Sequence, residues 1–378
     1  MKIFFTDCFD SIQLLDKLST PLTTFDRKSL YPFTFVKSCL DLRVGILTLR
    51  EKWRKLALKF DVHYVANDAD KEGLIWVSEN VIPSVALLQL LQRLRVGEVL
   101  VQDGYVLACC YTHKDSYRVQ EVDISVDLLK GIEDLFLLTG TEITHDFNHL
   151  VQSVQSSSIS GNQLLGNDLY VADRVSMECA TLNTLQGPIY IDEDVTIMEG
   201  AHLRGPLYLG KGAVVKMGAT IYGNVSVGKQ SVIGGEIGNS VIGDFSAKGH
   251  HGYLGCSVIG DWCNLGAGTS NSNLKNNLKT VSIYDYALDS VRDTGLLKCG
   301  AFIGDYTRLG INSALNTGTV IGIASMLADT SFYAKFVPSF AWVFDGGAQT
   351  YEFDKFMAYL ETLYASKGEE LTEQIKDK

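Results

Sequence analysis

The feature that most constrains this chain is an aliphatic residue at every sixth position. Starting from Ile191, the spacing holds without a break at Ile197, Leu203, Leu209, Val215, Ile221, Val227 and Ile233. A period of six matches neither the 3.6-residue period of an α-helix nor the two-residue alternation of a strand. It is typical of repeats whose short strands stack into a solenoid. The sequence therefore predicts a hexapeptide-repeat parallel β-helix.

Small or branched residues accompany this period two positions before most of the aliphatics. They are Val195, Ala201, Ala213, Ala219, Val225 and Ser231. We expect each aliphatic to point toward the solenoid axis and each small residue to permit a tight corner. The period returns later, at Ile259, Leu265, Ile303, Leu309, Leu315, Ile321 and Leu327.

Residues 1–150 show mixed patterns that predict an α/β domain. Glu98–Val101 and Tyr105–Cys110 flank an Asp-Gly pair, which is a hairpin signal. Further strands are expected at Ile3–Phe5 and Asp61–Ala66, and helices at Ser11–Leu18, Ser84–Leu94 and Gly131–Leu138.

The remainder divides into three parts. A serine-rich linker is expected over residues 151–168, with its polar stretch at Gln152–Gly161. The β-helix follows over residues 169–340 and is interrupted by an insertion at Ser270–Gly300, which leaves the six-residue phase. A C-terminal helical tail covers residues 341–378, with a helix at Phe353–Tyr364 and a solvated charged end.

Composition narrows the function classes. The chain has 378 residues and a formal net charge of −11, which gives nucleic-acid binding no electrostatic support. No apolar run approaches the ~20 residues of a membrane helix, and the start MKIFFTDCFD is too short and acidic for a signal peptide. The 8 cysteines form no CxxC pair, so we expect reduced thiols in a soluble, cytoplasmic protein.

Polar residues gather where the six-residue period loosens. The segment AKGHHGYLG contains the pair His250-His251, and NLGAGTSNSNLKNNLKT follows shortly after. Histidine suits general-base chemistry near neutral pH. Asn and Lys donors fit a phosphorylated, hydroxyl-rich ligand, and the small residues Gly266–Gly268 would let a ligand approach the main chain.

These two segments resemble the acetyltransferase domain of the GlmU-type family, the bifunctional UDP-N-acetylglucosamine diphosphorylases/glucosamine-1-phosphate N-acetyltransferases. The likeness is to the alternative, Bacteroidetes-type branch. It implies a left-handed parallel β-helix that assembles as a homotrimer and uses acetyl-coenzyme A (acetyl-CoA). It also implies that His250 is the base that deprotonates a sugar amine, which then attacks the acetyl thioester directly.

The same resemblance implies roles for further residues. Tyr253, Asn264 and Lys279 would hold the sugar phosphate, and Asn273 would orient the base or the amine. Ala267 and Thr317 are the expected acetyl-CoA contacts. The sequence departs from the family at Leu274, where many relatives carry an aromatic residue. The upstream cations that grip the phosphate have no matching position, and Arg204 and Lys216 are the candidates for that role.

The N-terminal part carries a second resemblance. Arg27–Phe35 and Asp41–Trp53 resemble the N-terminal region of the same branch and, distantly, sugar-nucleotide pyrophosphorylases. Such chemistry needs a glycine-rich loop, a cation and an acidic Mg²⁺ ligand, yet TTFDRKSL occupies the place of the loop. The nucleotide candidates are Arg43, Arg50 and Lys52, for which a structural role is an equal alternative. Asn67, Asp68 and Asp70 are the candidates near a Mg²⁺ ion, needed only if this domain is active.

Three functional hypotheses follow. The first is an acetyl-CoA-dependent N-acetyltransferase acting on an amino-sugar phosphate, fused to a nucleotidyltransferase-like domain. The second is a sugar-1-phosphate uridylyltransferase that uses the β-helix as a trimerisation scaffold. The third is a non-catalytic hexapeptide scaffold, against which the crowded polar segments argue. The sequence leaves the amino sugar and the acyl donor open.

Overall fold

The computed structural model describes residues 2–6, 22–60, 63–64, 72–114, 116–151, 160–329 and 332–376. Its internal contacts divide the chain into two units. The first contains residues 1–30, 38–42 and 47–134, and the second contains residues 31–37, 43–46 and 135–378. Two short segments from the first fifty residues thus belong to the solenoid unit. The expected helix at Ser11–Leu18 and most of the serine-rich stretch lie outside the described residues, and the domain limits inferred from the sequence remain predictions.

The first unit is built on a six-stranded mixed sheet with the order β2-β1-β3-β5-β4-β6. Its strands are β1 (Lys2–Thr6), β2 (His63–Tyr64), β3 (Ile75–Ser78), β4 (Glu98–Gln102), β5 (Tyr105–Cys110) and β6 (Arg118–Glu121). The expected hairpin is confirmed, because Gln102 pairs with Tyr105 in antiparallel register. The two loop residues, Asp103 and Gly104, both have positive φ (51° and 78°), as a type I′ turn requires.

Helices of the first unit are η3 (Arg27–Leu30), η4 (Cys39–Asp41), α1 (Leu49–Phe60) and α2 (Val85–Arg93). The helix expected at Ser84–Leu94 is confirmed as α2. The Ser84 hydroxyl caps it by accepting the Leu87 N–H at 3.1 Å, and Leu87, Leu88 and Leu91 are buried. The strand expected at Asp61–Ala66 is described only at β2, which pairs in parallel with β1.

The second unit is a parallel solenoid whose strands pair in three columns. The first column contains β8 (Leu169–Val171), β11 (Ile189–Ile191), β14 (Leu207–Leu209), β17 (Val225–Val227), β19 (Glu236–Ile242), β21 (Tyr253–Ile259), β26 (Ala301–Ile303), β29 (Thr319–Ile321) and β31 (Phe336–Val337). The second contains β7 (Gln163–Leu165), β10 (Thr181–Asn183), β13 (His202–Arg204), β16 (Thr220–Ile221), again β19 and β21, and the separate pair β23 (Ser270–Asn271) and β28 (Ala314–Leu315). The third contains β9 (Ser176–Met177), β12 (Thr196–Ile197), β15 (Val214–Val215), β18 (Val232–Ile233), β20 (Ala247–Lys248), β22 (Asn264–Leu265), β27 (Arg308–Leu309), β30 (Met326–Ala328) and β32 (Ala341–Phe344).

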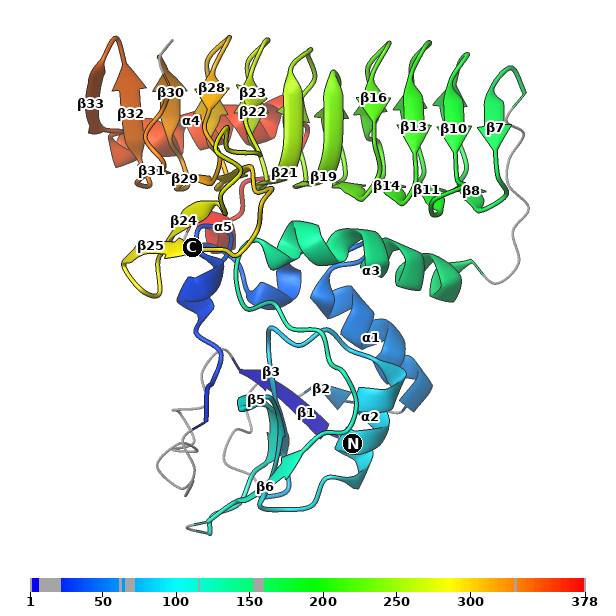
Figure 1. Cartoon of the computed structure of the whole chain (residues 1–378), viewed down its shortest axis with the longest axis vertical. Helices are drawn as coiled ribbons and strands as arrows, with labels where there is room; N and C mark the ends of the chain where they lie inside the picture. The colour runs from blue at the N-terminus through cyan, green and yellow to red at the C-terminus, as the bar shows by residue number, and fades with distance from the viewer. Residues whose placement is uncertain are drawn as a thin grey trace. The chain divides into compact units, whose positions relative to one another are not determined.

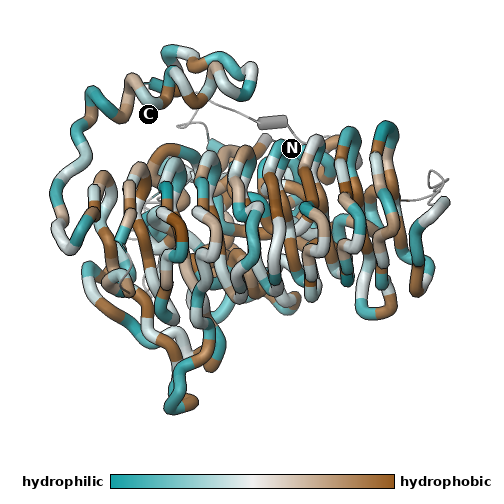
Figure 2. The backbone as a smooth tube through the Cα atoms, turned by 90° about the horizontal axis from the view of Figure 1, so that it is seen from above, coloured by the Kyte–Doolittle hydropathy of each residue, from teal (hydrophilic) through white to brown (hydrophobic). Residues whose placement is uncertain are grey.

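Register explains the six-residue period. Ile197 pairs with Val215 and Val215 with Ile233, so three six-residue units make one coil. The eight aliphatics from Ile191 to Ile233 are all at most 2% exposed, which confirms that they fill the axis. Glycines with positive φ, such as Gly200 (72°) and Gly218 (66°), turn the corners. The coils stand in a row in Figure 1, and Figure 2 shows hydrophobic stretches recurring from coil to coil.

One face of the solenoid is covered by α3 (Asp134–Leu150), which runs along the row of coils in Figure 1. The Phe136 ring lies 6.2 Å from the Phe302 ring of β26. At Gly140, a Cβ atom would come within 2.1 Å of the Asn224 side chain, so the helix packs closely there. The outward residues of β17, β26 and β29 are buried, and the hydroxyl of Ser226 on β17 donates to the Gly45 carbonyl at 2.7 Å. The helix expected at Gly131–Leu138 therefore begins later and extends to Leu150, since a solenoid face stabilises it.

Two cations fix the short N-terminal segments within the second unit. Lys37 Nζ lies 2.5 Å from an Asp261 carboxylate oxygen and 3.1 Å from Asp305. Burial by itself lowers the pKa of Lys37, but the two carboxylates outweigh burial and raise it. Arg43 donates to the Ile46 carbonyl at 2.6 Å and lies 3.4 Å from Asp244.

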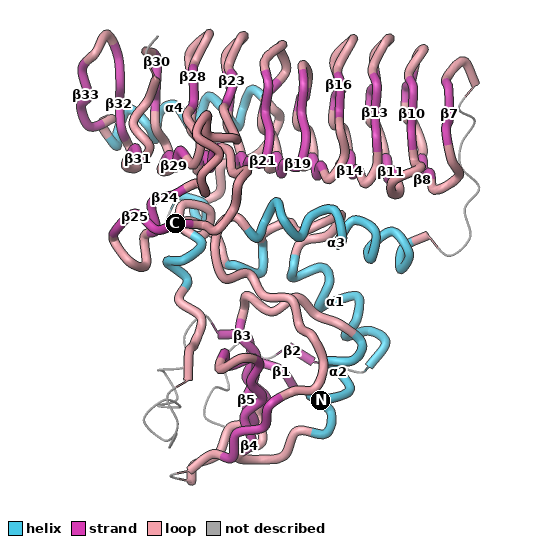
Figure 3. The backbone as a smooth tube through the Cα atoms, viewed as in Figure 1, coloured by secondary structure: helices cyan, strands magenta, loops and turns pink. Residues whose placement is uncertain are grey.

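The insertion is shorter than the sequence suggested. Ser270 and Asn271 still pair with Ala314 and Leu315, so the chain leaves the solenoid after Asn271. It then forms the antiparallel hairpin of β24 (Ser282–Asp285) and β25 (Ser290–Asp293), which projects from the coils in Figure 3. The solenoid resumes at β26.

The solenoid has strands on both sides of residues 169–340. At its start, β7 lies inside the expected linker. At its end, β32 pairs with β30 up to Phe344, and β33 (Gly347–Thr350) adds an antiparallel strand. The C-terminal helix is confirmed as α4 (Phe353–Ser366), where Tyr364 stacks on Trp262 at 4.4 Å. A short α5 (Glu373–Lys376) follows. Within the described ranges, no helix has the length and apolar character needed to cross a membrane.

Candidate functional site

The candidate site begins at the corner that follows β20. Ala247 pairs with Asn264 on the next coil. Three residues further along each coil, His250 and Ala267 therefore occupy the same corner position, one above the other. His250 is exposed and Ala267 is half-buried. The Ala267 carbonyl accepts the Asn312 N–H of the following coil at 2.6 Å, which continues the stack.

A polar pair lies beyond this corner. The Asn273 side-chain amide donates to the Tyr253 hydroxyl at 2.9 Å and lies 3.5 Å from the Cys256 sulfur. Burial raises the pKa of the Tyr253 hydroxyl and of the Cys256 thiol above their ordinary values. The main-chain carbonyl of Asn273 accepts the Cys299 N–H at 2.9 Å. Asn273 thus links the solenoid to both ends of the insertion.

The position of Tyr253 depends on a neighbouring glycine. A Cβ atom on Gly255 would lie 2.1 Å from the Tyr253 hydroxyl oxygen. Any other residue at this position would displace the phenol. The Tyr253 main chain is fixed as well, because its N–H donates to the Ser270 Oγ at 3.1 Å.

Other residues expected in the site are placed less closely together. Asn264 is half-buried on β22 and pairs with Arg308 of the next coil. Lys279 is exposed in the insertion, where its N–H donates to the Asn277 side chain at 3.2 Å. Among the contacts of the described residues, none joins the Lys279 side chain to Tyr253 or Asn264. The described contacts therefore do not bring Tyr253, Asn264 and Lys279 together in one hydrogen-bonded cluster.

Thr317 is buried just after β28. Its N–H and hydroxyl both face the Asn316 side-chain oxygen, at 2.8 and 3.4 Å. The N–H of the next residue, Gly318, donates to the Cys299 carbonyl at 3.2 Å. The residue after Thr317 therefore contacts Cys299, whose N–H in turn donates to the main-chain carbonyl of Asn273.

The two upstream cation candidates lie on lower coils. Lys216 follows β15, and a Cβ atom on Gly234 would be 3.1 Å from the Lys216 Cβ and 2.6 Å from the Gly249 carbonyl oxygen. Lys216 therefore belongs to the stack that leads upward to Gly249 and His250. Arg204 ends β13 and is exposed.

Sequence reasoning missed Lys248, which takes the inward position of its coil. It pairs with Ile233 and is 1% exposed. Its ammonium donates to the Gly234 carbonyl at 3.1 Å and to the His250 carbonyl at 2.5 Å. Burial lowers its pKa to about 8. A signal was present, because counting in sixes from Ile242 lands on Lys248 and then on Leu254.

The nucleotide candidates have partners within the protein. Arg43 belongs to the second unit, where it contacts Ile46 and Asp244 and lies 5.3 Å from the Tyr208 ring centroid. Arg50 Nε donates to an Asp41 oxygen at 2.6 Å in the first unit. Lys52 is buried in α1. These contacts are consistent with a structural role for the three residues. Nucleotide binding by them stays a prediction.

Among the residues that the structure describes, no group of three or more His, Cys, Asp or Glu side chains could hold a metal ion. The Mg²⁺ candidates Asn67, Asp68 and Asp70 lie outside the described residues.

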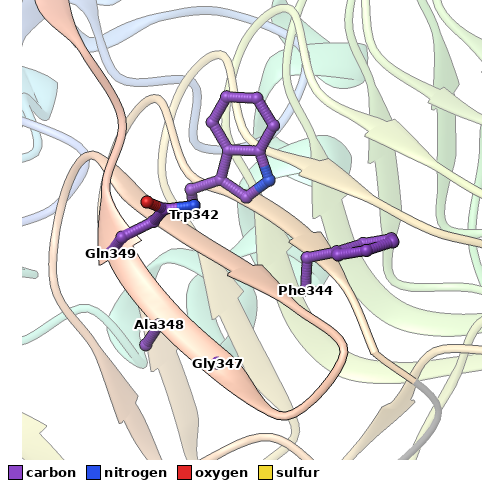
Figure 4. Close-up of a pocket in the computed structure, with 5 residues that line it drawn as sticks. All are labelled: Trp342, Phe344, Gly347, Ala348 and Gln349. Carbon is purple, nitrogen blue, oxygen red and sulfur yellow. The ribbon is translucent and has the colours of Figure 1, made fainter.

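A separate hollow lies at the C-terminal end of the solenoid (Figure 4). It is lined by Trp342, Phe344, Gly347, Ala348 and Gln349. In the third column, β30, β27 and β22 separate β32 from β20. The hollow is therefore distinct from the His250 corner.

Comparison with known proteins agrees with the prediction that a nucleotidyltransferase-like part is joined to a β-helix. Residues 23–155 match the sugar nucleotidyl transferase family. The bifunctional sugar-1-phosphate nucleotidylyltransferase/acetyltransferase of Sulfurisphaera tokodaii is 38% identical over 140 residues, which cover 36% of this chain and 34% of that protein. The bifunctional protein GlmU of Methanococcus aeolicus is 36% identical over 94 residues, covering 24% and 22%. The predicted resemblance to GlmU-type proteins is thus confirmed as a distant one, and the chain spans about a third or less of the length of these curated relatives.

Two solved structures share similarity with this chain. The polySia specific acetyltransferase NeuO has a TM-score of 0.30 and 17% identity, covering 54% of this chain and 94% of that one. An Arabidopsis UDP-N-acetylglucosamine acyltransferase has a TM-score of 0.26 and 14% identity, covering 57% and 78%.

Proposed function

We propose that this chain is an acetyl-CoA-dependent N-acetyltransferase that acts on an amino-sugar phosphate such as glucosamine-1-phosphate. One observation carries the proposal. The exposed His250 and the main chain at Ala267 share one corner of successive coils, and the Tyr253–Asn273 pair lies just beyond it. In the proposal, His250 supplies the base, the Ala267 main chain supplies a surface for the acyl donor, and Tyr253 and Asn273 supply polar groups for the sugar.

The reaction needs a proton acceptor beside the amine. His250 takes the proton of the sugar amine as the nitrogen attacks the thioester carbonyl carbon. The C–N bond forms, the C–S bond breaks, and the coenzyme A thiolate leaves and receives the proton from the imidazolium. Asn273 orients the base or amine through its amide, which Tyr253 helps to hold. No covalent enzyme intermediate is required.

Binding of the sugar phosphate is assigned to polar and cationic side chains of the solenoid and the insertion. Tyr253, Asn264 and Lys279 supply hydroxyl, amide and ammonium groups, and Lys216 and Arg204 are further cations on the lower coils. Local cations can bind an anion even though the chain carries a net charge of −11. Ala267 is assigned to main-chain contacts with acetyl-CoA, and Thr317 to a contact nearer the insertion.

Assembly as a homotrimer is part of the proposal. Some residues on the face formed by the second column are exposed, including Arg204 and Tyr222, the latter 52% exposed. Met217, at a corner of the same region, is 63% exposed. A trimer would cover such residues, and light scattering during size-exclusion chromatography measures the mass of the particle against the 41.6 kDa of one chain.

A product assay tests the proposed chemistry. The full chain is incubated with glucosamine-1-phosphate and acetyl-CoA, and free thiol and N-acetylated sugar are measured. We expect both products in equal amounts. Thiol release without the acetylated sugar, or neither product with a panel of amino-sugar phosphates, would overturn the proposal.

The family match at residues 23–155 favours a second candidate function, sugar-1-phosphate uridylyl transfer by the N-terminal part. Arg43, Arg50 and Lys52 are its nucleotide candidates, and its Mg²⁺ ion would bind near residues 67–70. Adding UTP and Mg²⁺ to the same assay tests it, because this activity releases pyrophosphate and forms a UDP-sugar. Pyrophosphate release that persists in the presence of excess EDTA would contradict a Mg²⁺-dependent transfer.

A further inference from the structure

Lys248 stands where the solenoid elsewhere places an aliphatic side chain. Ile233 pairs with it from the coil below, and the pairing of Ala247 with Asn264 sets Leu265 beside it from the coil above. Both neighbours are at most 2% exposed, and Lys248 itself is 1% exposed. Burying an ammonium in such an axis is costly unless it is hydrogen-bonded. A lysine at this place therefore calls for an explanation.

The hydrogen bonds of the Lys248 ammonium explain why a lysine occupies this position. Nζ donates to the carbonyl of Gly234 on the lower coil and to the carbonyl of His250 at the next corner, at 3.1 and 2.5 Å. The second bond is charge-assisted and short. It ties the main chain of His250 to the solenoid axis from inside.

Close packing at the corner adds to this restraint. A Cβ atom on Gly235 would lie 2.7 Å from the His250 carbonyl oxygen and 2.8 Å from that of Gly252. The lower coil thus contacts the same carbonyl that Lys248 binds. His250 projects outward from a peptide that is held on its inner side, while its own side chain is exposed.

We propose that Lys248 is a positioning residue that fixes the main chain of His250 and thereby the place from which the imidazole reaches the substrate amine. The proposal rests on the proposed acetyl transfer. Lys248 acts from within the solenoid and does not touch the substrate. A displacement of about 1 Å at a catalytic group can cost a factor of order 10² in rate, so loss of this bond should reduce turnover more than binding.

The main test variant is Lys248→Met. Methionine is unbranched, apolar and similar in length, so it suits the aliphatic column and should fold. We expect kcat to fall at least tenfold, with the KM for acetyl-CoA changed less than threefold and Tm not reduced by more than a few degrees. Lys248→Gln keeps N–H donors on a shorter side chain and should recover part of kcat. Lys211→Met, which removes an exposed lysine, is the matched control and should behave as the native chain does.

A readout independent of activity accompanies the kinetics. With isotope-labelled histidine, the NMR signals of the His250 amide and imidazole should shift in Lys248→Met, whereas those of His202 should not. An unchanged kcat, or His250 signals that stay in place, would overturn the positioning role. The variant His250→Ala separates failure of the positioning role from failure of the acetyl-transfer proposal. Full activity in His250→Ala would remove the catalytic role of His250. The NMR shifts in Lys248→Met would still report whether Lys248 holds the His250 main chain. If neither Lys248→Met nor Lys248→Gln folds, the His250 NMR signals of the native chain are followed from pH 7 to pH 10. We expect them to shift over this range, and unchanged signals would contradict the proposal.

Discussion

The side-chain amide of Asn273 donates a 2.9 Å hydrogen bond to the hydroxyl of Tyr253. The two residues are twenty positions apart, and the bond joins β21 to the first residues that leave the solenoid. The Asn273 carbonyl also accepts the N–H of Cys299, where the chain returns. Asn273 therefore closes the base of the insertion through its main chain and contacts Tyr253 of the proposed site through its side chain.

Replacing Tyr253 by phenylalanine removes this bond. We expect Tyr253→Phe to lower the free energy of unfolding by about 0.5–1.5 kcal/mol, the net contribution of one such bond. Urea unfolding measures the loss. Tyr222→Phe, at a tyrosine that is 52% exposed, is the control and should change stability little. Equal losses in the two variants would mean that the bond to Asn273 does not stabilise the fold.

The packing of the axis predicts a large effect from a single truncation. Ile221 points into the axis and is 2% exposed, while its neighbour Thr220 on β16 faces outward and is half-buried. Ile221→Ala should cost about 2–5 kcal/mol of unfolding free energy because it leaves a cavity. Thr220→Ala should stay within about 0.5 kcal/mol. Comparable losses at both positions would contradict the inward placement of Ile221.

Asp305 predicts a pH dependence of stability. Burial raises its pKa to about 6, even though Lys37 acts in the opposite direction. A carboxyl whose folded pKa lies above its ordinary 3.8 contributes stability below that value and loses it as the pH rises through 6. Relative to Asp305→Asn, the native chain should therefore lose unfolding free energy between pH 4 and pH 6. Chemical unfolding of both proteins across that range measures this, and parallel curves would show that Asp305 titrates normally.

Lys248 predicts the opposite trend at high pH. Burial lowers its folded pKa from 10.5 to about 8, so the unfolded chain binds more protons than the folded chain between these values. The native chain should gain stability relative to Lys248→Met as the pH rises from 8 to 10.5. Denaturant unfolding at half-unit pH steps tests this. A constant difference would mean that the buried ammonium titrates as a free lysine does.

Much of the solenoid could be predicted because its signal is local and repeated. The six-residue period determines which side chains point inward, and the structure buries them as expected. Counted from Ile242, the same six-residue period also falls on Lys248. Because the other positions are aliphatic, a lysine there is taken as an interruption of the period. Only the hydrogen bonds to Gly234 and His250 show that it continues the pattern.

Other features depend on contacts between distant residues. Lys37 meets Asp261 across 224 positions, and no local pattern indicates that residues 31–37 belong with the solenoid. The length of α3 likewise depends on the face it covers. In the site, the family resemblance implied separate roles for Tyr253 and Asn273, whereas their direct hydrogen bond and the contact of Gly318 with Cys299 required the three-dimensional path of the insertion.

The pair of adjacent histidines allows the most direct test of the central claim. Both His250 and His251 are exposed, and only His250 shares its corner with Ala267. With glucosamine-1-phosphate and acetyl-CoA, His250→Ala should lose acetyl transfer by a factor of about 10²–10⁴, as expected when a general base is removed, and His251→Ala should retain most of it. An active His250→Ala protein, or equal losses in the two variants, would contradict the assignment of His250 as the base.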